Sequence, residues 1–122
     1  MIFSKNKITL IAEIANAHEG NPTLAKKLID AASENNADII KFQIFTATEL
    51  LERNHENFKL FKNLEMSSGQ WTKLIRYAKH KKLKVFVDVF GINSAKMAHN
   101  LKVDGYKIHT SDITNPILLE FF

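Results

Sequence analysis

Segments with the pattern of buried strands alternate with segments with the pattern of helices along the whole of this 122-residue chain. Short runs dominated by apolar residues are typical of strands that are buried on both faces. Four such runs occur, at residues 8–14, 39–45, 84–90 and 106–109. A strand followed by a helix, repeated four times, predicts a parallel sheet with right-handed crossovers.

The helices between these runs are predicted from residues that favour helix starts. Asparagine and serine cap the first turn, proline suits the first helical position, and a serine followed three residues later by glutamine forms a capping box. Four starts are recognised in this way: Asn21-Pro22, Ser67 with Gln70, Asn93, and Asn115-Pro116. Residues 46–66 are less clear and give a helical pattern only towards their end.

The repeated Asn-Pro pair, each time after a strand and a short polar loop, indicates a repeating βα unit. Such units build the (β/α)8 barrel, which needs about 250 residues, so four of them are half a barrel. A small doubly wound sheet is the alternative, but it usually has a glycine-rich first turn. The four glycines of this chain form no such cluster. We therefore expect an α/β fold made of half a TIM-type barrel.

Composition excludes several classes of protein. The chain is 45% hydrophobic and 25% charged, which is typical of a globular domain. It has no cysteine and no long apolar segment, so the sequence predicts no disulfide and no membrane span, and a cytoplasmic protein. The basic run KHKKLK at 79–84 follows a helix, where cations complement the helix dipole. We expect no nucleic-acid partner.

Two lysines lie inside apolar strand runs, Lys41 in ADIIKFQIF and Lys107 in DGYKIH. A lysine rarely enters a core without an anionic partner. One interpretation is a cationic pocket for a phosphate or carboxylate ligand. The alternative is a buried ion network in which the lysines pair with Glu13, Asp88 or Asp112.

Further polar residues follow the strands, at the end of a parallel sheet where active sites collect. His18 and His109 are candidates for substrate contact or metal ligation. The other histidines are expected at the surface, and the large aromatic side chains in packing. These residues are His55, His80 and His99, and Trp71, Phe58 and Phe61.

Three segments together resemble the N-acetylneuraminate (sialic acid) synthase family: IAEIANAHEGNPTLAKKLIDAA, ADIIKFQIFTATELL and YKIHTSDITNPILLE. The resemblance covers essentially the whole chain. It implies a barrel enzyme that condenses phosphoenolpyruvate with an N-acylated hexosamine such as N-acetylmannosamine. It also implies a divalent metal ion, Mn²⁺ or Mg²⁺, whose histidine ligands lie in the second half of the barrel, and a C-terminal antifreeze-like domain. Neither the second half nor that domain is in this sequence.

The same resemblance implies roles for individual residues. Lys41, Lys107 and Thr110 would contact phosphoenolpyruvate. A second group would face the sugar and its aldehyde as catalytic residues, and a third would complete the substrate site. The second group is Glu13, Gln43 and Asp112, and the third is Ser111, His18 and Asn16.

The sequence departs from the family pattern at three places. Ala17 precedes His18 where the family has asparagine. The third strand ends VDVF where the family has STPF with a phosphate-contacting threonine, so that Asp88 would repel a phosphate unless a cation intervenes. Ser111 replaces a glycine. These changes indicate a divergent branch of the family.

We expect residues 1–122 to be the N-terminal half of such a barrel and to be inactive alone. The open strand edges of a half barrel favour a homodimer or a longer chain. Two further hypotheses remain. One is another barrel lyase or aldolase that forms a Schiff base with a sugar phosphate through Lys41 or Lys107. The other is a half barrel that serves as a non-catalytic binding module. The sequence leaves open which amino sugar is used and which nonulosonic acid is made.

Overall fold

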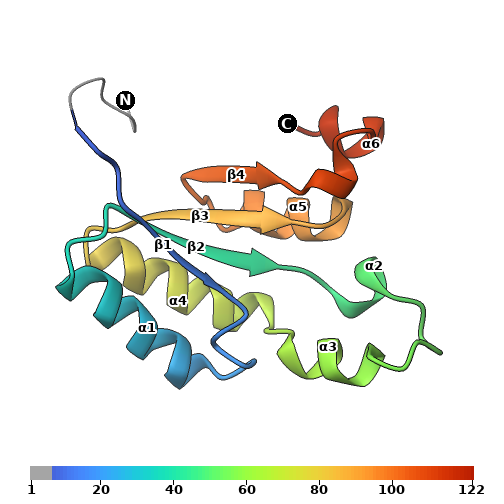
Figure 1. Cartoon of the computed structure of the whole chain (residues 1–122), viewed down its shortest axis with the longest axis horizontal. Coiled ribbons are helices and arrows are strands. Elements are labelled where there is room, and N and C mark those ends of the chain that lie inside the picture. Colours follow the sequence, from blue (N-terminus) through green and yellow to red (C-terminus); the bar gives the residue numbers. More distant parts are fainter. Residues whose placement is uncertain (1–6) are drawn as a thin grey trace.

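The computed structural model describes residues 7–122 of the chain. Strands and helices alternate along it, as the sequence predicts (Figure 1). The elements are β1 Ile11–Ala15, α1 Pro22–Glu34, β2 Ile39–Ile44, α2 Ala47–Leu50, α3 Phe58–Leu64, α4 Ser68–His80, β3 Lys84–Val89, α5 Ile92–Asn100, β4 Gly105–Ile108, the 3-10 helix η1 Thr110–Asp112, and α6 Pro116–Leu119.

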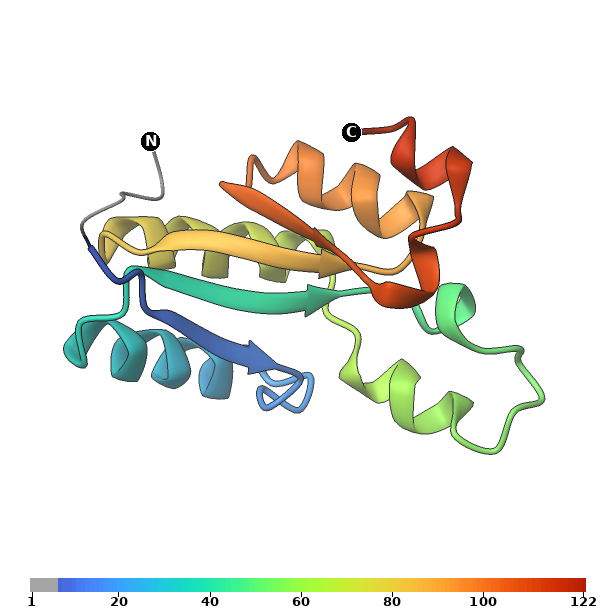
Figure 2. The same cartoon turned by 45° about the horizontal axis from the view of Figure 1, so that its top comes forward.

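The four strands form one parallel sheet in the order β1-β2-β3-β4. Helices α1, α4 and α5 lie on the same side of this sheet, and its other side carries no helix of the described chain (Figures 1 and 2). Crossovers of one hand that always add the next strand on the same side place every helix on one face. A doubly wound sheet has helices on both faces, so that alternative is wrong. The winding is that of a barrel.

The apolar core fills the space between the sheet and its helices. Alternate strand residues point into it, including Phe42 of β2 and Val87 of β3, which are completely buried. Trp71 of α4 is 2% exposed and packs edge-on against Phe42, with ring centroids 5.4 Å apart. The prediction that Trp71 serves packing is thus confirmed. Because side chains alternate along a strand, the residues between these apolar ones face the opposite, open side.

Three of the predicted helix starts are confirmed by their hydrogen bonds. The Asn21 side chain accepts from the amides of Thr23 and Leu24. Asn115 accepts from the amide of Leu118 in the same way. Ser67 and Gln70 bond reciprocally to each other's backbone, as a capping box requires.

The predicted cap at Asn93 is wrong, because the N-cap of α5 is Gly91, two residues earlier, and the helix begins at Ile92. The free amides of that first turn instead donate to a carboxylate from the short helix α2. Oε1 of Glu49 accepts from the amides of Asn93 and Ser94 at 2.8 and 3.1 Å. A Cβ atom on Gly91 would come within 2.5 Å of the same oxygen. Glycine at this position therefore makes room for the Glu49 cap.

The first strand is shorter than predicted. It begins at Ile11, because the amide of Leu10 is bonded to the Asp38 side chain rather than to a strand. Ile8 is 89% exposed and lies outside the sheet. The fourth strand starts at Gly105, one residue before its predicted start. Within residues 7–122, every helix is too short or too polar to cross a membrane.

Candidate functional site

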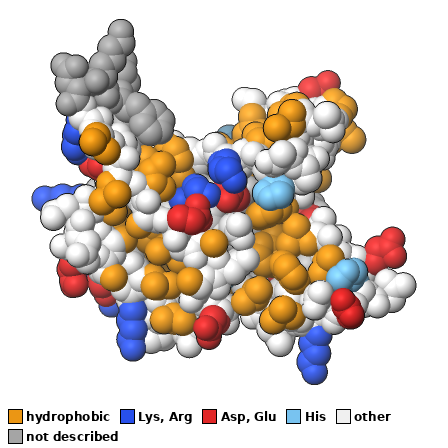
Figure 3. All heavy atoms as spheres, in the orientation of Figure 1, with side chains coloured by type: hydrophobic (Ala, Val, Ile, Leu, Met, Phe, Trp, Pro, Cys, Tyr) orange, Lys and Arg blue, Asp and Glu red, His pale blue; other side chains and the backbone are white. Residues whose placement is uncertain are grey.

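A cluster of charged side chains occupies the open face of the sheet, on the side away from the helices. Glu13 is the register partner of Lys41, and Asp88 is the register partner of both Gln43 and Lys107. These five residues therefore come from all four strands and share one face. Figure 3 shows basic and acidic side chains next to one another near the centre of the molecule, with hydrophobic side chains around them. We refer to Glu13, Lys41, Asp88 and Lys107 as the ion cluster.

Lys41 is the buried lysine of this cluster. The residue is 9% exposed, and its Nζ lies 2.7 Å from Oδ2 of Asp88 and also contacts the Glu13 carboxylate. Burial alone would lower the pKa of this amine, but the hydrogen bonds and charges of Asp88 and Glu13 outweigh it and raise the pKa above 10.5. Lys41 is therefore held in its charged form.

Lys107 differs from the sequence expectation, because its side chain is 53% exposed. Its Nζ lies 3.5 Å from Oδ1 of Asp88, an ion pair without a hydrogen bond. The physical reason is its strand. β4 is an edge of the four-stranded sheet, so no neighbouring strand of the described chain covers Lys107 on its outer side. The prediction that both lysines are buried is right for Lys41 and wrong for Lys107.

Asp88 joins the two lysines. Its side chain is 2% exposed, with one oxygen towards Lys41 and the other towards Lys107. The ion network that the sequence left open as an alternative is thus present, with Glu13 and Asp88 as its acids and without Asp112. The charges of two ammonium groups and two carboxylates cancel, so the cluster is a neutral network rather than a purely cationic pocket. Asp88 was expected as a possible partner of the lysines but was not counted among the predicted site residues, although an acid inside the apolar run KVFVDVF is the same signal that singled out the lysines.

Asn16 and Gln43 also lie together on this side of the sheet. Nδ2 of Asn16 donates to Oε1 of Gln43 at 2.8 Å. The contact depends on an irregularity at the end of β1, where Ala15 has φ of +47° and its amide bonds to the Glu13 carboxylate. Oδ1 of Asn16 is buried and has no hydrogen-bond partner among residues 7–122. An unpaired buried acceptor next to a charged cluster is suited to a ligand hydroxyl or amide.

Helix η1 carries the predicted residues that follow β4. Thr110 and Ser111 are exposed, and the Ser111 hydroxyl lies 2.9 Å from Nδ1 of His109. Asp112 accepts from the Asn115 side chain at 3.2 Å. It forms no ion pair with either strand lysine in the described part of the chain, so the suggestion that it balances them is wrong.

His18 lies on the other side of the sheet from the ion cluster. It is 1% exposed, and its ring packs edge-on against Trp71 of α4 at 5.5 Å. Nδ1 accepts from the amide of Gly20, and burial lowers the pKa of the imidazole, which favours the neutral form. The expectation that His18 reaches the substrate face does not fit this position. The loop approaches the backbone of α3 closely at Gly20, which has φ of +70°, because a Cβ atom there would lie 2.1 Å from the carbonyl oxygen of Asn63.

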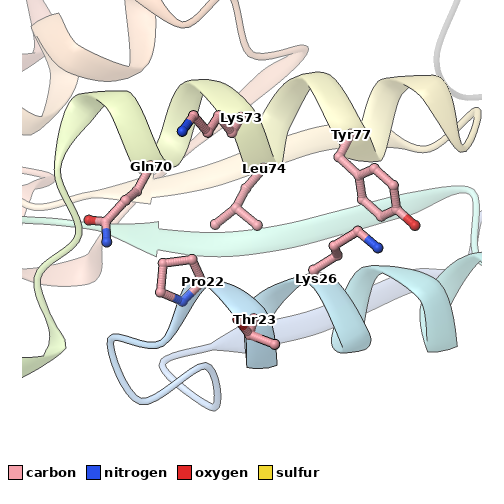
Figure 4. A pocket seen from close by; sticks show the side chains of 7 residues that line it. All are labelled: Pro22, Thr23, Lys26, Gln70, Lys73, Leu74 and Tyr77. Atoms are coloured by element: carbon pink, nitrogen blue, oxygen red, sulfur yellow. The ribbon is translucent and has the colours of Figure 1, made fainter.

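A separate hollow of about 490 Å³ lies between α1 and α4 on the helical side (Figure 4). Its lining includes Lys26, Lys73 and Tyr77. Nζ of Lys26 is 4.4 Å from the centroid of the Tyr77 ring. The hollow is a groove between two surface helices, and none of its lining residues belongs to the ion cluster.

Several proteins to which this chain is similar are named as biosynthetic synthases. The chain is 28% identical to the N,N'-diacetyllegionaminic acid synthase of Campylobacter jejuni, over 89% of this chain and 37% of that protein. It is 32% identical to the N-acetylneuraminate-9-phosphate synthase of Homo sapiens, over 91% of this chain and 34% of that protein. The structure matches an N-acetylneuraminic acid synthetase from Leptospira borgpetersenii, solved with citrate, with a TM-score of 0.87 and 31% identity, over 95% of this chain and 41% of that one.

The chain thus spans roughly a third of the length of the curated relatives that it matches. A family model described as the NeuB family matches residues 28–122, which is most of the sequence and includes β2, β3 and β4. Sequence, fold and family model agree, and the chain belongs to the NeuB family.

Proposed function

We propose that this chain provides the phosphoenolpyruvate-binding strands of a nonulosonic acid synthase. The proposed reaction joins C3 of phosphoenolpyruvate to the aldehyde carbon of an N-acylated amino sugar of the N-acetylmannosamine type. Water is taken up, inorganic phosphate is released, and the product is a nonulosonic acid. The names of the synthase relatives support this class of reaction.

The observation that carries the proposal is the arrangement of Lys41 and Lys107 on one face of the parallel sheet, on β2 and β4, the two strands on either side of β3. Phosphoenolpyruvate carries a phosphate and a carboxylate, and ammonium groups are suited to both. Lys107 is half-exposed and bound only loosely to Asp88, so its charge is accessible to a ligand. In this proposal Thr110 and Ser111, which follow Lys107 closely, add hydroxyl groups to the same subsite.

The sugar subsite is proposed at the other edge of the cluster. Glu13 has a half-exposed carboxylate beside Lys41, and the Asn16–Gln43 pair offers amides with an unsatisfied acceptor. Carboxylates and amides bind sugar hydroxyls, and a carboxylate can also accept a proton during the addition to the aldehyde. Asp112 is kept as a candidate for this subsite, whereas His18 is withdrawn because it lies on the helical side.

We propose that the ligands of the divalent metal ion lie outside residues 7–122. Among residues 7–122, no three His, Asp or Glu side chains lie close enough to hold a metal ion. The described residues therefore do not fit a metal site, and none of the roles proposed above depends on one.

A Schiff-base lyase or aldolase is the weaker candidate. Such an enzyme needs a neutral lysine amine as nucleophile, usually one whose pKa is lowered by burial. The pKa of Lys41 is raised instead, because two carboxylates surround it. Borohydride trapping with a sugar phosphate distinguishes the two reactions. The synthase proposal expects no covalent adduct, and an adduct at Lys41 or Lys107 would favour the lyase.

Calorimetric titration of phosphoenolpyruvate in the presence of Mn²⁺ tests the proposed function. We expect binding to the chain that falls at least tenfold in Lys107→Gln. Lys73→Gln, in the groove between α1 and α4, is the matched control and should bind as the unchanged chain does. Release of inorganic phosphate with N-acetylmannosamine is then measured for the chain and for any longer product of its reading frame. Absence of binding, or equal loss in both variants, would exclude the proposal.

A further inference from the structure

The ion cluster has a negative group where a bound anion would be expected. The Asp88 carboxylate lies between the two ammonium groups, 2.7 Å from Nζ of Lys41 and 3.5 Å from Nζ of Lys107. Its side chain is 2% exposed, so it is a fixed part of the sheet. A ligand phosphate that contacted both lysines would have to share them with this carboxylate.

The two oxygens of Asp88 are engaged to different degrees. Oδ2 has a short hydrogen bond from Lys41. Oδ1 is buried and has no hydrogen-bond partner among the described residues, although Lys107 is its ion-pair neighbour. The contact to Lys41 is therefore the tight one, and the contact to Lys107 is loose enough to be exchanged for a ligand.

Lys41 has a second reason to remain in place. The Glu13 carboxylate also contacts its Nζ, so the ammonium group already has two anionic partners inside the protein. A lysine that is paired with two carboxylates and shielded from water has little attraction left for a further anion. Within residues 7–122, Lys107 has Asp88 as its only ion-pair partner, and its side chain is half-exposed.

We propose that Asp88 is a specificity-determining residue that sets the anion affinity of this site. It engages Lys41 within the protein, leaves Lys107 as the lysine that binds the ligand, and repels highly charged anions. The class of ligand concerned is the phosphate monoester, and in this respect the inference rests on the proposed function. The unchanged chain therefore binds phosphate groups weakly, and removal of the negative charge at position 88 strengthens their binding.

The test is the affinity for inorganic phosphate, measured by calorimetry in the unchanged chain and in Asp88→Asn. Asparagine has nearly the same shape as aspartate but no charge. We expect phosphate to bind at least tenfold more tightly to Asp88→Asn, and the gain to disappear when Lys107→Gln is added. Circular dichroism and thermal unfolding establish that each variant is folded. Asp88→Thr, with a smaller side chain and a hydroxyl donor, provides a second uncharged variant and should bind phosphate more tightly as well.

Two variants separate this effect from a change of overall charge. Asp30→Asn removes a carboxylate on α1 that pairs with Lys81, far from the cluster, and should leave phosphate affinity unchanged. Glu13→Gln removes the other acid next to Lys41 without touching Lys107, and should increase affinity less than Asp88→Asn does. An equal gain in Asp30→Asn and Asp88→Asn would contradict the proposal.

The outcomes also separate this inference from the proposed function. Unchanged or weaker phosphate binding in both Asp88 variants overturns the inference, even if the unchanged chain binds phosphoenolpyruvate through Lys107. Tighter phosphate binding in the Asp88 variants supports the inference, even if no condensation of phosphoenolpyruvate with an amino sugar is ever observed and the proposed function fails.

Discussion

Lys41 and Lys107 occupy similar apolar strand sequences but opposite environments. Lys41 lies on a central strand, is shielded by its neighbours, and bonds to two carboxylates. Lys107 lies on the edge strand β4, is half-exposed, and has one loose partner. Their local sequences are alike, and the difference comes from the strands on either side. It teaches that the same residue type serves the fold at one position and remains available to a ligand at the other.

The largest expected effect concerns stability. Lys41→Met leaves Asp88 buried without its main partner and should lower the free energy of unfolding by roughly 3 kcal/mol or more. Lys107→Met removes an exposed pair and should cost less than about 1 kcal/mol. Urea denaturation of both variants measures the difference. Equal losses of stability in the two variants would contradict the difference between the buried Lys41 and the exposed Lys107.

A loss of stability of intermediate size is expected when the carboxylate cap of α5 is removed. Glu49→Ala removes the carboxylate that bonds the first turn of α5, and loss of a helix cap costs about 1 kcal/mol, up to about 2 kcal/mol. Hydrogen exchange at the start of α5 should increase together with this loss. Thr48→Ala, the neighbouring exposed residue, is the control and should have little effect. Unchanged protection in Glu49→Ala would contradict the cap.

A smaller net effect is expected when both members of the buried pair become apolar. Replacing a buried ion pair with hydrophobic residues of similar volume is often neutral or stabilising. The double variant Lys41→Met, Asp88→Leu should therefore recover most of the stability lost in Lys41→Met, to within about 1 kcal/mol of the unchanged chain. If the double variant is no more stable than Lys41→Met, then the stability lost in Lys41→Met does not come from the unpaired Asp88.

The smallest effect is a dependence of stability on alkaline pH. Because the pKa of Lys41 is raised in the folded chain above its usual 10.5, its charged form stabilises the fold at every pH below the unfolded value. That contribution is lost as the pH rises through the folded pKa. The unchanged chain should therefore lose stability above pH 10.5 more steeply than Lys41→Met, as measured by urea denaturation. Parallel curves would contradict the raised pKa.

Much of the fold follows from local sequence patterns, and so does part of the site. Apolar runs and capping residues determine where strands and helices begin. Side-chain alternation places Lys41 and Gln43 on one face of β2, opposite the buried Phe42. These features depend on neighbours in the sequence, so a single sequence is enough to predict them.

The features that were missed depend on tertiary structure. His18 lies in the core, in a turn that has residues with positive φ at the end of β1 (Ala15) and in the following loop (Glu19 and Gly20). The alternation of side chains along a strand does not predict such a turn. Lys107 is exposed because β4 is an edge, and edges are set by sheet order. Glu49 caps a helix more than 40 residues further on, although its Thr46–Glu49 capping-box spacing was visible in the sequence.

The central claim is that the anion site lies on the open face of the sheet, around Asp88 and Lys107. Titration of phosphoenolpyruvate into the ¹⁵N-labelled chain, followed by amide chemical shifts, tests it most directly. We expect the largest shifts at Asp88, Lys107 and Thr110, towards the carboxyl ends of the strands. Shifts confined to Lys26, Lys73 and Tyr77, in the groove between α1 and α4, or no shifts at all, would contradict the claim.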